Sequence, residues 1–308
     1  MIISASRRTD IPAVYPEWFL NRLREGEVFV PNPYNRKKVN RILLSPDTVD
    51  CIVFWTKNPE PLMPYLKEIK EMGYRFYFQM TITDYEEDME PGVPSTEESI
   101  ATFLLLSEMI GKERIDWRFD PVLLTDKYSI DYHAEKFEMM CRWLHRATKR
   151  CIISFVDAYK ESRYSELESE EMKCLAEVFS KIAAKYKLPL YTCAERIDLS
   201  EYGIEHGACI DLGRVEEITG YKLDLKRDHG QRPQCRCVES IDVGMYDTCI
   251  NGCKYCYAAG KRENVQRKYN MHDAASPVLI GGLKGDEIIT TKVLQSNKDN
   301  QLSLFDFL

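Results

Sequence analysis

The sequence lacks any apolar run that approaches the ~20 residues needed to cross a bilayer as a helix. It also lacks an excess of positive charge. The formal net charge is −7 at pH 7, which argues against a protein that coats nucleic acid by bulk electrostatics. The N-terminus begins directly with a strand-like segment and lacks the design of a signal peptide. Internal repeats and low-complexity blocks are absent as well. We therefore expect a cytoplasmic protein without membrane contact.

The 308 residues are 44% hydrophobic and 30% charged, which is ordinary for a globular protein with a sizeable core. Eleven of them are cysteines, and reducing compartments disfavour a disulfide framework. Four cysteines lie in apolar or helical contexts and are expected to be small buried hydrophobes: Cys51, Cys141, Cys151 and Cys174. The other seven all follow residue 190, and packing alone does not explain that asymmetry.

Strand-like and helix-like segments alternate through the first two hundred residues. The expected strands are Met1–Ala5, Cys51–Trp55, Tyr74–Ile82, Ile115–Val122, Cys151–Val156 and Leu188–Cys193. The expected helices between them are Pro16–Glu25, Pro61–Met72, Ser95–Ile110, Asp131–Lys149 and Glu166–Lys187. Strands separated by helical crossovers predict an α/β fold with a parallel sheet, and six such units favour a (β/α) barrel or partial barrel.

The pattern changes near Arg227, and we divide the chain there. Residues 1–226 are expected to form the barrel body, and residues 227–289 a cysteine-rich iron–sulfur segment that closes it. Within that segment we expect a helix at Lys261–Lys268 and a short strand at Ser276–Gly282. Residues 290–308 are expected to be a polar linker followed by a C-terminal peptide.

Polar side chains follow each expected strand, and chemistry gathers at the carboxyl ends of the strands in a parallel barrel. Asp10 and Lys57 follow the first two strands. Arg7, Arg118 and Asp120 are the candidate catalytic residues, and Glu195 is a candidate for cofactor binding. Each charge alone is more simply explained as a solvated loop residue. Together they predict a charged pocket for a zwitterionic cofactor or a phosphorylated substrate.

Three cysteines cluster near the end of the chain, at Cys249, Cys253 and Cys256, in a Cys-x3-Cys-x2-Cys spacing. Asn251 and Gly252 allow the backbone between them to turn, so the three thiolates can converge on one metal centre. Cubane iron–sulfur clusters normally have four Cys ligands, so three would leave one iron open to another ligand. A structural zinc ion would instead require four ligands.

The triplet, with Tyr255 before its last cysteine, resembles the signature of radical S-adenosylmethionine enzymes. The resemblance implies a 4Fe–4S cluster on Cys249, Cys253 and Cys256, S-adenosylmethionine on the open iron, and Tyr255 near the adenine. It also implies a reductant such as flavodoxin or ferredoxin, and a 5′-deoxyadenosyl radical that abstracts hydrogen from a substrate.

Those enzymes usually carry the triplet after the first barrel strand, whereas here only about fifty residues follow it. Over nearly its full length the chain is similar to uncharacterised bacterial proteins with a barrel-like body, including the segments Ser6–Asp10 and Phe54–Pro59. A circularly permuted core reconciles the two resemblances. Asp242–Tyr246 would then supply the strand before the triplet, and Gly281 and Gly282 would contact the methionine amine.

Four further cysteines define a second candidate metal site: Cys193, Cys209, Cys235 and Cys237. Four thiolates suffice for a second iron–sulfur cluster or a structural zinc ion. His206 and His229 are alternative ligands, and a Cys-x-Cys pair also occurs without metal.

The C-terminal residues Gln301, Leu302, Leu304 and Phe305 resemble the peptide by which bacterial replication and repair proteins bind the DNA sliding clamp. If this peptide instead folds back on the body, the resemblance is without consequence. A clamp-bound enzyme would favour a nucleic acid substrate.

Three functions remain open at this stage. The first is a radical S-adenosylmethionine enzyme. The second is a non-catalytic iron–sulfur or zinc binding module that is recruited to a partner. The third is a barrel hydrolase that acts through Asp120, Asp157 and Glu195. Release of 5′-deoxyadenosine separates the first from the second, and activity after cluster removal would indicate the third.

Overall fold

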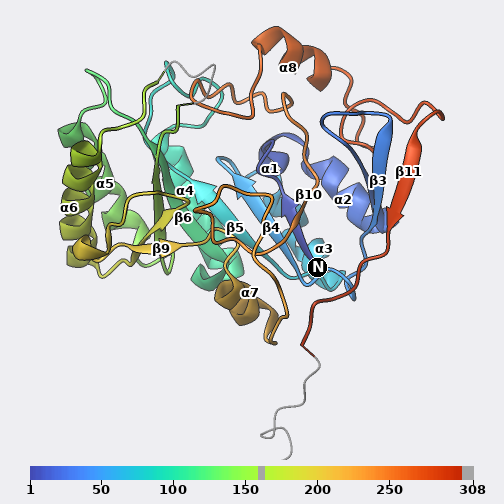
Figure 1. The fold of residues 1–308 in the computed structure, drawn as a ribbon, viewed down its shortest axis with the longest axis horizontal. Coiled ribbons are helices and arrows are strands. Elements are labelled where there is room, and N and C mark those ends of the chain that lie inside the picture. Colours follow the sequence, from blue (N-terminus) through green and yellow to red (C-terminus); the bar gives the residue numbers. More distant parts are fainter. Residues whose placement is uncertain (159–163, 300–308) are drawn as a thin grey trace, which may run out of the picture.

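The structure is a computed structural model that describes residues 1–158 and 164–299. Its centre is a curved parallel sheet of eight strands in the order β10-β1-β4-β5-β6-β7-β8-β9 (Figure 1). The strands are β1 (Ile2–Ala5), β4 (Cys51–Thr56), β5 (Phe76–Thr81), β6 (Ile115–Val122), β7 (Cys151–Phe155), β8 (Leu190–Cys193), β9 (Glu205–Gly207) and β10 (Ile241–Asp242). This α/β fold is consistent with a partial parallel barrel, as the alternating pattern predicts.

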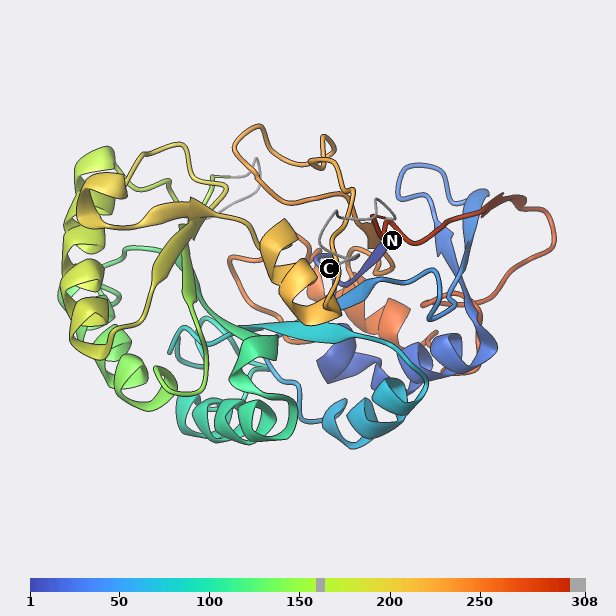
Figure 2. The ribbon, with the colours of Figure 1, turned by 90° about the horizontal axis from the view of Figure 1, so that it is seen from below.

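Helices cover the outer, convex side of the sheet (Figure 2). They are α1 (Ile11–Val14), α2 (Pro16–Glu25), α3 (Leu66–Glu71), α4 (Thr96–Ile110), α5 (Ile130–Leu144) and α6 (Ser169–Tyr186). Helix α4, expected over Ser95–Ile110, begins with a capping box between Ser95 and Glu98 and is capped at its end by Gly111. Helix α7 (Leu212–Thr219) lies on the concave side, where Arg214 donates to the buried Asp116 of β6 at 3.0 Å.

Alternate strand residues face opposite sides of the sheet and form two hydrophobic clusters. The large cluster under the helices contains Phe54 and Phe78, whereas the smaller concave cluster contains Val53 and Tyr77. Cys209, Cys235 and Cys237 also belong to the concave cluster. The second candidate metal site is therefore part of a hydrophobic core.

Strand β10 occupies the sheet edge beside β1, with Ile241 in register with Ile3. It precedes the triplet in the chain. A strand is expected there at Asp242–Tyr246, whereas the observed strand spans only Ile241–Asp242. Helix α8 (Arg262–Tyr269) follows the triplet, close to the predicted helix at Lys261–Lys268. The segment that carries the triplet thus joins the same parallel sheet as the N-terminal strands.

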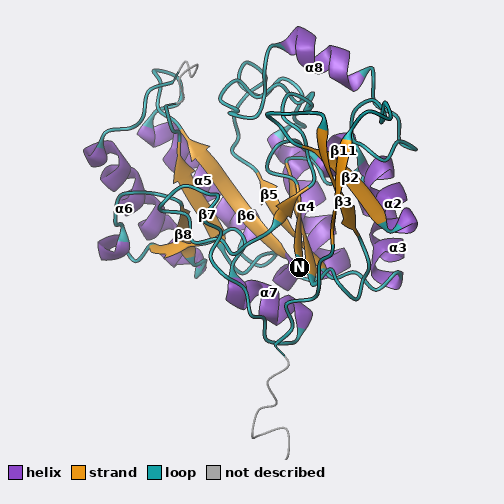
Figure 3. Cartoon of the chain, turned by 45° about the vertical axis from the view of Figure 1, so that its right-hand side comes forward, coloured by secondary structure: helices purple, strands orange, loops and turns teal. Residues whose placement is uncertain are grey.

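A second sheet contains β2 (Glu27–Pro31), β3 (Lys38–Leu43) and β11 (Ile288–Lys292) in the order β11-β3-β2 (Figure 3). This sheet is not predicted from the sequence, in which residues 290–292 are expected to belong to a linker. All five residues of β11 are exposed, so the strand lacks the buried alternation that identifies strands in a sequence.

Two other predicted elements differ from the structure. Residues 276–282 are bent instead of extended, because Gly281 has a φ of 75° and Ser276 donates to its carbonyl at 2.6 Å. The helix predicted over Asp131–Lys149 ends at Leu144, and Thr148 then donates to the Ile115 carbonyl of β6 at 2.7 Å. The six predicted strands of the main sheet are confirmed, with the start of β5 moved from Tyr74 to Phe76 and that of β8 from Leu188 to Leu190.

The last described residues are attached to the amino end of the sheet. Asp50 accepts hydrogen bonds from the N-terminus, from the Ser296 hydroxyl and from the Asn297 backbone N–H at 2.9 Å. Residues 300–308, which include Gln301, Leu302, Leu304 and Phe305, lie outside the described residues. None of the described helices is long and apolar enough to span a membrane.

Candidate functional site

The carboxyl side of the main sheet carries both cysteine groups. We call Cys249, Cys253 and Cys256 the triplet, and Cys193, Cys209, Cys235 and Cys237 the quartet. All seven thiols are free. The triplet residues are all partly exposed, whereas three of the quartet residues are buried and only Cys193 is partly exposed.

Backbone contacts hold the triplet loop against the segment that follows β5. The Gly92 N–H donates to the Asn251 carbonyl at 2.9 Å, and the Lys254 N–H donates to the Met89 carbonyl at 3.0 Å. A Cβ atom at Gly92 would lie 2.8 Å from the Asn251 backbone, so only glycine permits this approach. The loop itself turns at Gly252, which has a φ of 69°.

Asp10 connects the triplet loop to the ends of β1 and β4. Its carboxylate caps α1, accepts the Lys57 N–H at 2.8 Å and accepts the Asn251 side-chain amide at 3.2 Å. Burial raises the pKa of Asp10 to about 6, and its hydrogen bonds oppose that rise. The side chain therefore fixes the loop above two strand ends.

Glu90 forms the centre of a second polar group beside Cys253. It accepts hydrogen bonds from the Tyr255 hydroxyl and from Thr83 at 3.0 Å, and Lys57 pairs with it at 2.9 Å. Lys57 also lies 5.8 Å from the Tyr255 ring centroid. These contacts orient Tyr255 with its hydroxyl turned inward.

The triplet thiols lie near one another in a desolvated environment. Burial raises the pKa of Cys249 to about 12, and it also raises the pKa values of Cys253 and Cys256. Lys57 opposes the shift at Cys253, and backbone N–H groups of Ala258 and Ala259 oppose it at Cys256. Cation and N–H donors of this kind stabilise thiolates, which are the form that binds metal.

The quartet is assembled from distant parts of the chain. Cys193 ends β8, Cys209 follows β9, and Cys235 and Cys237 lie in the loop before β10. The Cys193 and Cys209 sulfurs are 2.8 Å apart, and the Cys237 thiol interacts with those of Cys209 and Cys235. The Cys209 carbonyl also accepts from the Tyr77 hydroxyl at 2.7 Å, which fixes it over β5.

Two arginines adjoin the quartet. Arg118 donates to the Cys209 sulfur at 2.6 Å and pairs with Asp120. The charge of Arg7 lowers the pKa of Cys237, after the larger effect of hydrogen bonds from Cys209 and Cys235. Both guanidinium groups lie over the Trp55 ring, at 5.2 Å for Arg7 and 5.4 Å for Arg118. The predicted catalytic residues are thus gathered at one place.

Asp120 adjoins the quartet through Arg118 and lies near Lys57, which is beside the triplet. It accepts from Ser154, and the nearby charges of Arg118 and Lys57 hold its pKa below the usual range despite burial. Glu195 is also close by and accepts the Phe155 N–H at 2.9 Å, and burial raises its pKa to about 8. The structure therefore brings Asp120 and Glu195 to the same end of the sheet as Arg118.

Gly281 and Gly282 lie in the bent segment after α8. The Gly281 N–H donates to the Met271 carbonyl at 3.0 Å, and a Cβ at Gly282 would meet nothing within 4 Å. His206 is engaged with Thr192 at 2.9 Å. Asp157 pairs with Arg232.

A family model described as a domain of unknown function, DUF1848, matches residues 2–258. The chain belongs to this family. The matched region contains the whole triplet and the whole quartet, and it ends before α8. No curated protein matches the chain.

Solved structures that match include a putative alpha-L-fucosidase from Bacteroides thetaiotaomicron, at 11% identity over 72% of this chain and 83% of that one. The TM-score of 0.27 is too low to support any inference about the DUF1848 fold or its activity.

Sequence reasoning missed two residues of this site. Glu90 lies in an acidic loop with Glu86, Glu87 and Asp88, and nothing local distinguishes it from its neighbours. Trp55 reads as an ordinary strand residue, yet it contacts both arginines, and its indole nitrogen is buried without a hydrogen-bond partner among the described residues.

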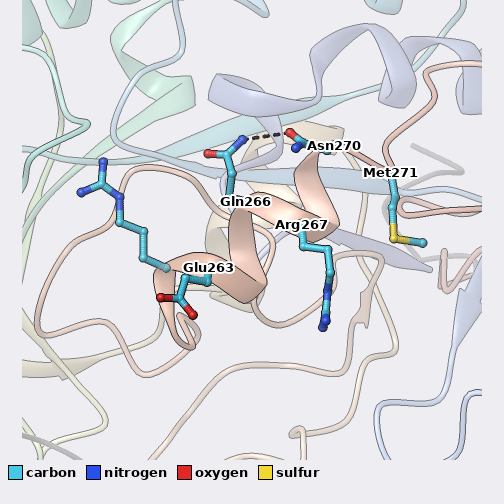
Figure 4. A pocket seen from close by; sticks show the side chains of 6 residues that line it. Glu263, Gln266, Arg267, Asn270 and Met271 are labelled. Atoms are coloured by element: carbon cyan, nitrogen blue, oxygen red, sulfur yellow. Dashed lines mark hydrogen bonds between the residues drawn. The ribbon is translucent and has the colours of Figure 1, made fainter.

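No three His, Cys, Asp or Glu side chains in residues 1–158 and 164–299 are already placed to hold a single metal ion. A surface hollow of about 700 Å³ lies along α8, where Gln266 donates to Asn270 at 2.9 Å (Figure 4). Its lining comes from α8 and from Asn270 and Met271 directly after it, so we do not assign it a role in the cysteine sites.

Proposed function

We propose that this chain is an iron–sulfur enzyme of the radical S-adenosylmethionine type, with a 4Fe–4S cluster on Cys249, Cys253 and Cys256. The observation that carries the proposal is the fixed, partly exposed triplet loop at the carboxyl end of a parallel sheet. A cubane binds each thiolate to a different iron. The three thiolates of the triplet can therefore bind such a cluster even though they are not placed to coordinate a single ion.

The residues around the triplet fit this cofactor. Lys57 opposes the rise that burial causes in the pKa of Cys253, and the backbone N–H groups of Ala258 and Ala259 oppose it at Cys256. A three-cysteine site leaves one iron open, as the binding of S-adenosylmethionine requires.

The position of β10 supports a permuted core. In the family that the triplet resembles, the triplet usually follows the first strand of the barrel. Here β10 precedes the triplet in the chain and pairs in parallel with β1 at the sheet edge. In the sheet order β10 is the first strand, although it comes late in the sequence. The triplet therefore follows the first strand of the sheet, as it does in that family.

The charged residues at this end of the sheet suit a zwitterionic ligand. Asp120 and Glu90 supply negative charge for an amine, whereas Lys57 and Arg7 supply positive charge for a carboxylate. We assign Arg118 and Trp55 to the wall of this pocket, because Arg118 is fixed by Asp120 and lies over the Trp55 ring. Tyr255 is oriented by Glu90 so that its ring can lie near the adenine.

Cys249, Cys253 and Cys256 would hold the cluster, which would supply one-electron reductive cleavage of S-adenosylmethionine with flavodoxin or ferredoxin as the electron source. The protein's own contribution is to orient the ligand and to exclude water from the radical. The buried Asp10 and Glu90, together with the largely buried Lys57, hold the loop in place.

We propose nucleic acid as the substrate class. Lys261, Arg262 and Arg267 are exposed on and beside α8, which follows the triplet loop directly and forms a local basic patch on an acidic chain. Binding of a single-stranded oligonucleotide should weaken as salt rises and should fall in an Arg262→Glu/Arg267→Glu variant. Unchanged binding in that variant would remove this substrate class.

The test of the reaction is anaerobic reconstitution with iron and sulfide, followed by S-adenosylmethionine and dithionite. The wild-type chain should release 5′-deoxyadenosine, and a Cys253→Ala variant should not. A reconstituted chain that binds iron but releases no 5′-deoxyadenosine would instead support a non-catalytic binding module. The Arg7→Met and Arg118→Met variants should bind S-adenosylmethionine more weakly, and unchanged affinity and activity would remove these residues from the pocket.

A further inference from the structure

We infer that the quartet of Cys193, Cys209, Cys235 and Cys237 is a closed site for one zinc ion. This site is separate from the triplet, and the inference does not rest on the proposed reaction. The four thiols come from three segments of the chain, yet their sulfurs form a continuous set of contacts inside the concave hydrophobic cluster.

The spacing of the sulfurs distinguishes a single ion from a cluster. Zinc–sulfur bonds of about 2.3 Å place tetrahedral sulfurs roughly 3.8 Å apart. The Cys193 and Cys209 sulfurs are 2.8 Å apart, so these two thiols need to separate by only about 1 Å to bind one ion. A cubane would require a larger displacement, because each of its thiolates binds a different iron.

The same contacts explain why the described residues present no open ion site. Protonated thiols can donate hydrogen bonds to one another, and the Cys193 and Cys209 sulfurs, 2.8 Å apart, are too close together to surround an ion. Zinc binds thiolates and releases their protons, which removes these hydrogen bonds. The ion would then replace the contacts between Cys193, Cys209 and Cys237.

Groups outside the quartet already donate toward its sulfurs. The Ile210 backbone N–H donates to the Cys237 sulfur at 3.3 Å, and Arg118 donates to the Cys209 sulfur at 2.6 Å. Hydrogen bonds of this kind orient metal ligands and tune their basicity. They would be retained after the thiol protons are lost, because their hydrogens belong to the donors.

The charges around the quartet also suit a thiolate site. Four thiolates with one divalent ion carry net negative charge, and Arg7 and Arg118 offset part of it. Asp120 takes up part of the Arg118 charge, and Asp228 lies 3.8 Å from Arg7. One terminal nitrogen of Arg7, Nη2, is nevertheless buried without a hydrogen-bond partner among the described residues.

Zinc at this position would connect the ends of β8 and β9 to the loop that carries Cys235 and Cys237. That loop has little regular structure and is held by contacts such as the one from Arg227 to the Cys235 carbonyl at 2.8 Å. Because Arg118 contacts both Cys209 and Asp120, the ion would also fix one wall of the pocket beside the triplet.

The test begins with the metal content of the full-length chain purified under reducing conditions. We expect about one zinc ion per chain, lost in a Cys235→Ser/Cys237→Ser variant. It should be retained in a Cys174→Ser variant, whose cysteine is exposed on α6 and belongs to neither group. Zinc retained in a Cys249→Ser/Cys253→Ser/Cys256→Ser variant would show that the zinc site does not use the triplet.

A second measurement does not depend on whether the quartet variant folds. Cobalt(II) exchanged into the wild-type chain should give the visible absorption bands of a tetrahedral four-thiolate site. Three results would overturn the inference. They are zinc that remains in the Cys235→Ser/Cys237→Ser variant, a cobalt spectrum without thiolate bands, and a loss of bound iron and sulfide, instead of zinc, in that variant. Two disulfides and no metal in the chain as purified would also overturn it.

Discussion

The triplet and the quartet differ in how the chain brings their sulfurs together. The triplet comes from eight consecutive residues on one loop, is partly exposed, and has charged and aromatic side chains around it. The quartet comes from distant segments, is largely buried, and shares its surroundings with Val53 and Tyr77 of a hydrophobic cluster. An exposed three-ligand site suits reactivity, whereas a buried four-ligand site suits structure.

The largest expected effect is the loss of activity when a cysteine of the triplet is replaced. Cys253→Ala should remove the cluster and lower 5′-deoxyadenosine formation by about a hundredfold or more, because two thiolates do not hold a cubane. Its melting temperature should change little, since the Cys253 side chain is small and partly exposed. Activity and thermal unfolding of the same reconstituted sample measure both. A Cys253→Ala variant that retains full activity would contradict the difference between the groups.

Removal of the quartet metal should have the opposite consequence. Chelation of zinc, or Cys237→Ala, should lower the melting temperature by roughly 5–10 °C, because the ion would tie the 227–238 loop to the ends of β8 and β9. Iron on the triplet should remain. Calorimetry with and without chelator measures the shift, and Cys174→Ala serves as the control. An unchanged melting temperature would assign the quartet a role other than stability.

A smaller effect is expected where the triplet loop meets the segment after β5. Gly92→Ala places a Cβ 2.8 Å from the Asn251 backbone, so the loop must shift, at a cost of about 1–3 kcal/mol. Iron bound after reconstitution should fall, whereas Gly213→Ala in α7, whose Cβ meets its nearest neighbour at 3.4 Å, should bind iron normally. Equal iron content in both variants would show that the loop tolerates displacement.

The smallest effect compares two tyrosines that flank Cys256. Tyr255→Phe removes a hydrogen bond to the charged Glu90, whereas Tyr257→Phe removes one to the neutral Arg7 carbonyl at 2.6 Å. Hydrogen bonds to charged groups contribute more, so Tyr255→Phe should destabilise the chain by about 1.5–3 kcal/mol and Tyr257→Phe by about 1 kcal/mol. Urea denaturation measures both, and a reversed order would indicate that Glu90 is satisfied without Tyr255.

The sequence predicted those features whose signals are local. The buried strand Cys51–Trp55 and the helix expected over Ser95–Ile110 are predicted correctly because the residues that define each feature lie close together in the chain. The triplet was found for the same reason. Strand β11 was missed because it is exposed, and Glu90 because only tertiary contacts with Lys57 and Tyr255 distinguish it. The quartet could be suggested from its residue types, but the contact between Cys193 and Cys209 depends on the neighbouring strands β8 and β9.

The claim that the two cysteine groups hold different metals is tested most directly by counting metals in one anaerobically reconstituted sample of the full chain. The account predicts about four iron atoms with matching sulfide, together with about one zinc ion, per chain. About eight iron atoms without zinc would contradict the assignment of the quartet. A chain that contains zinc but binds no iron would contradict the assignment of the triplet.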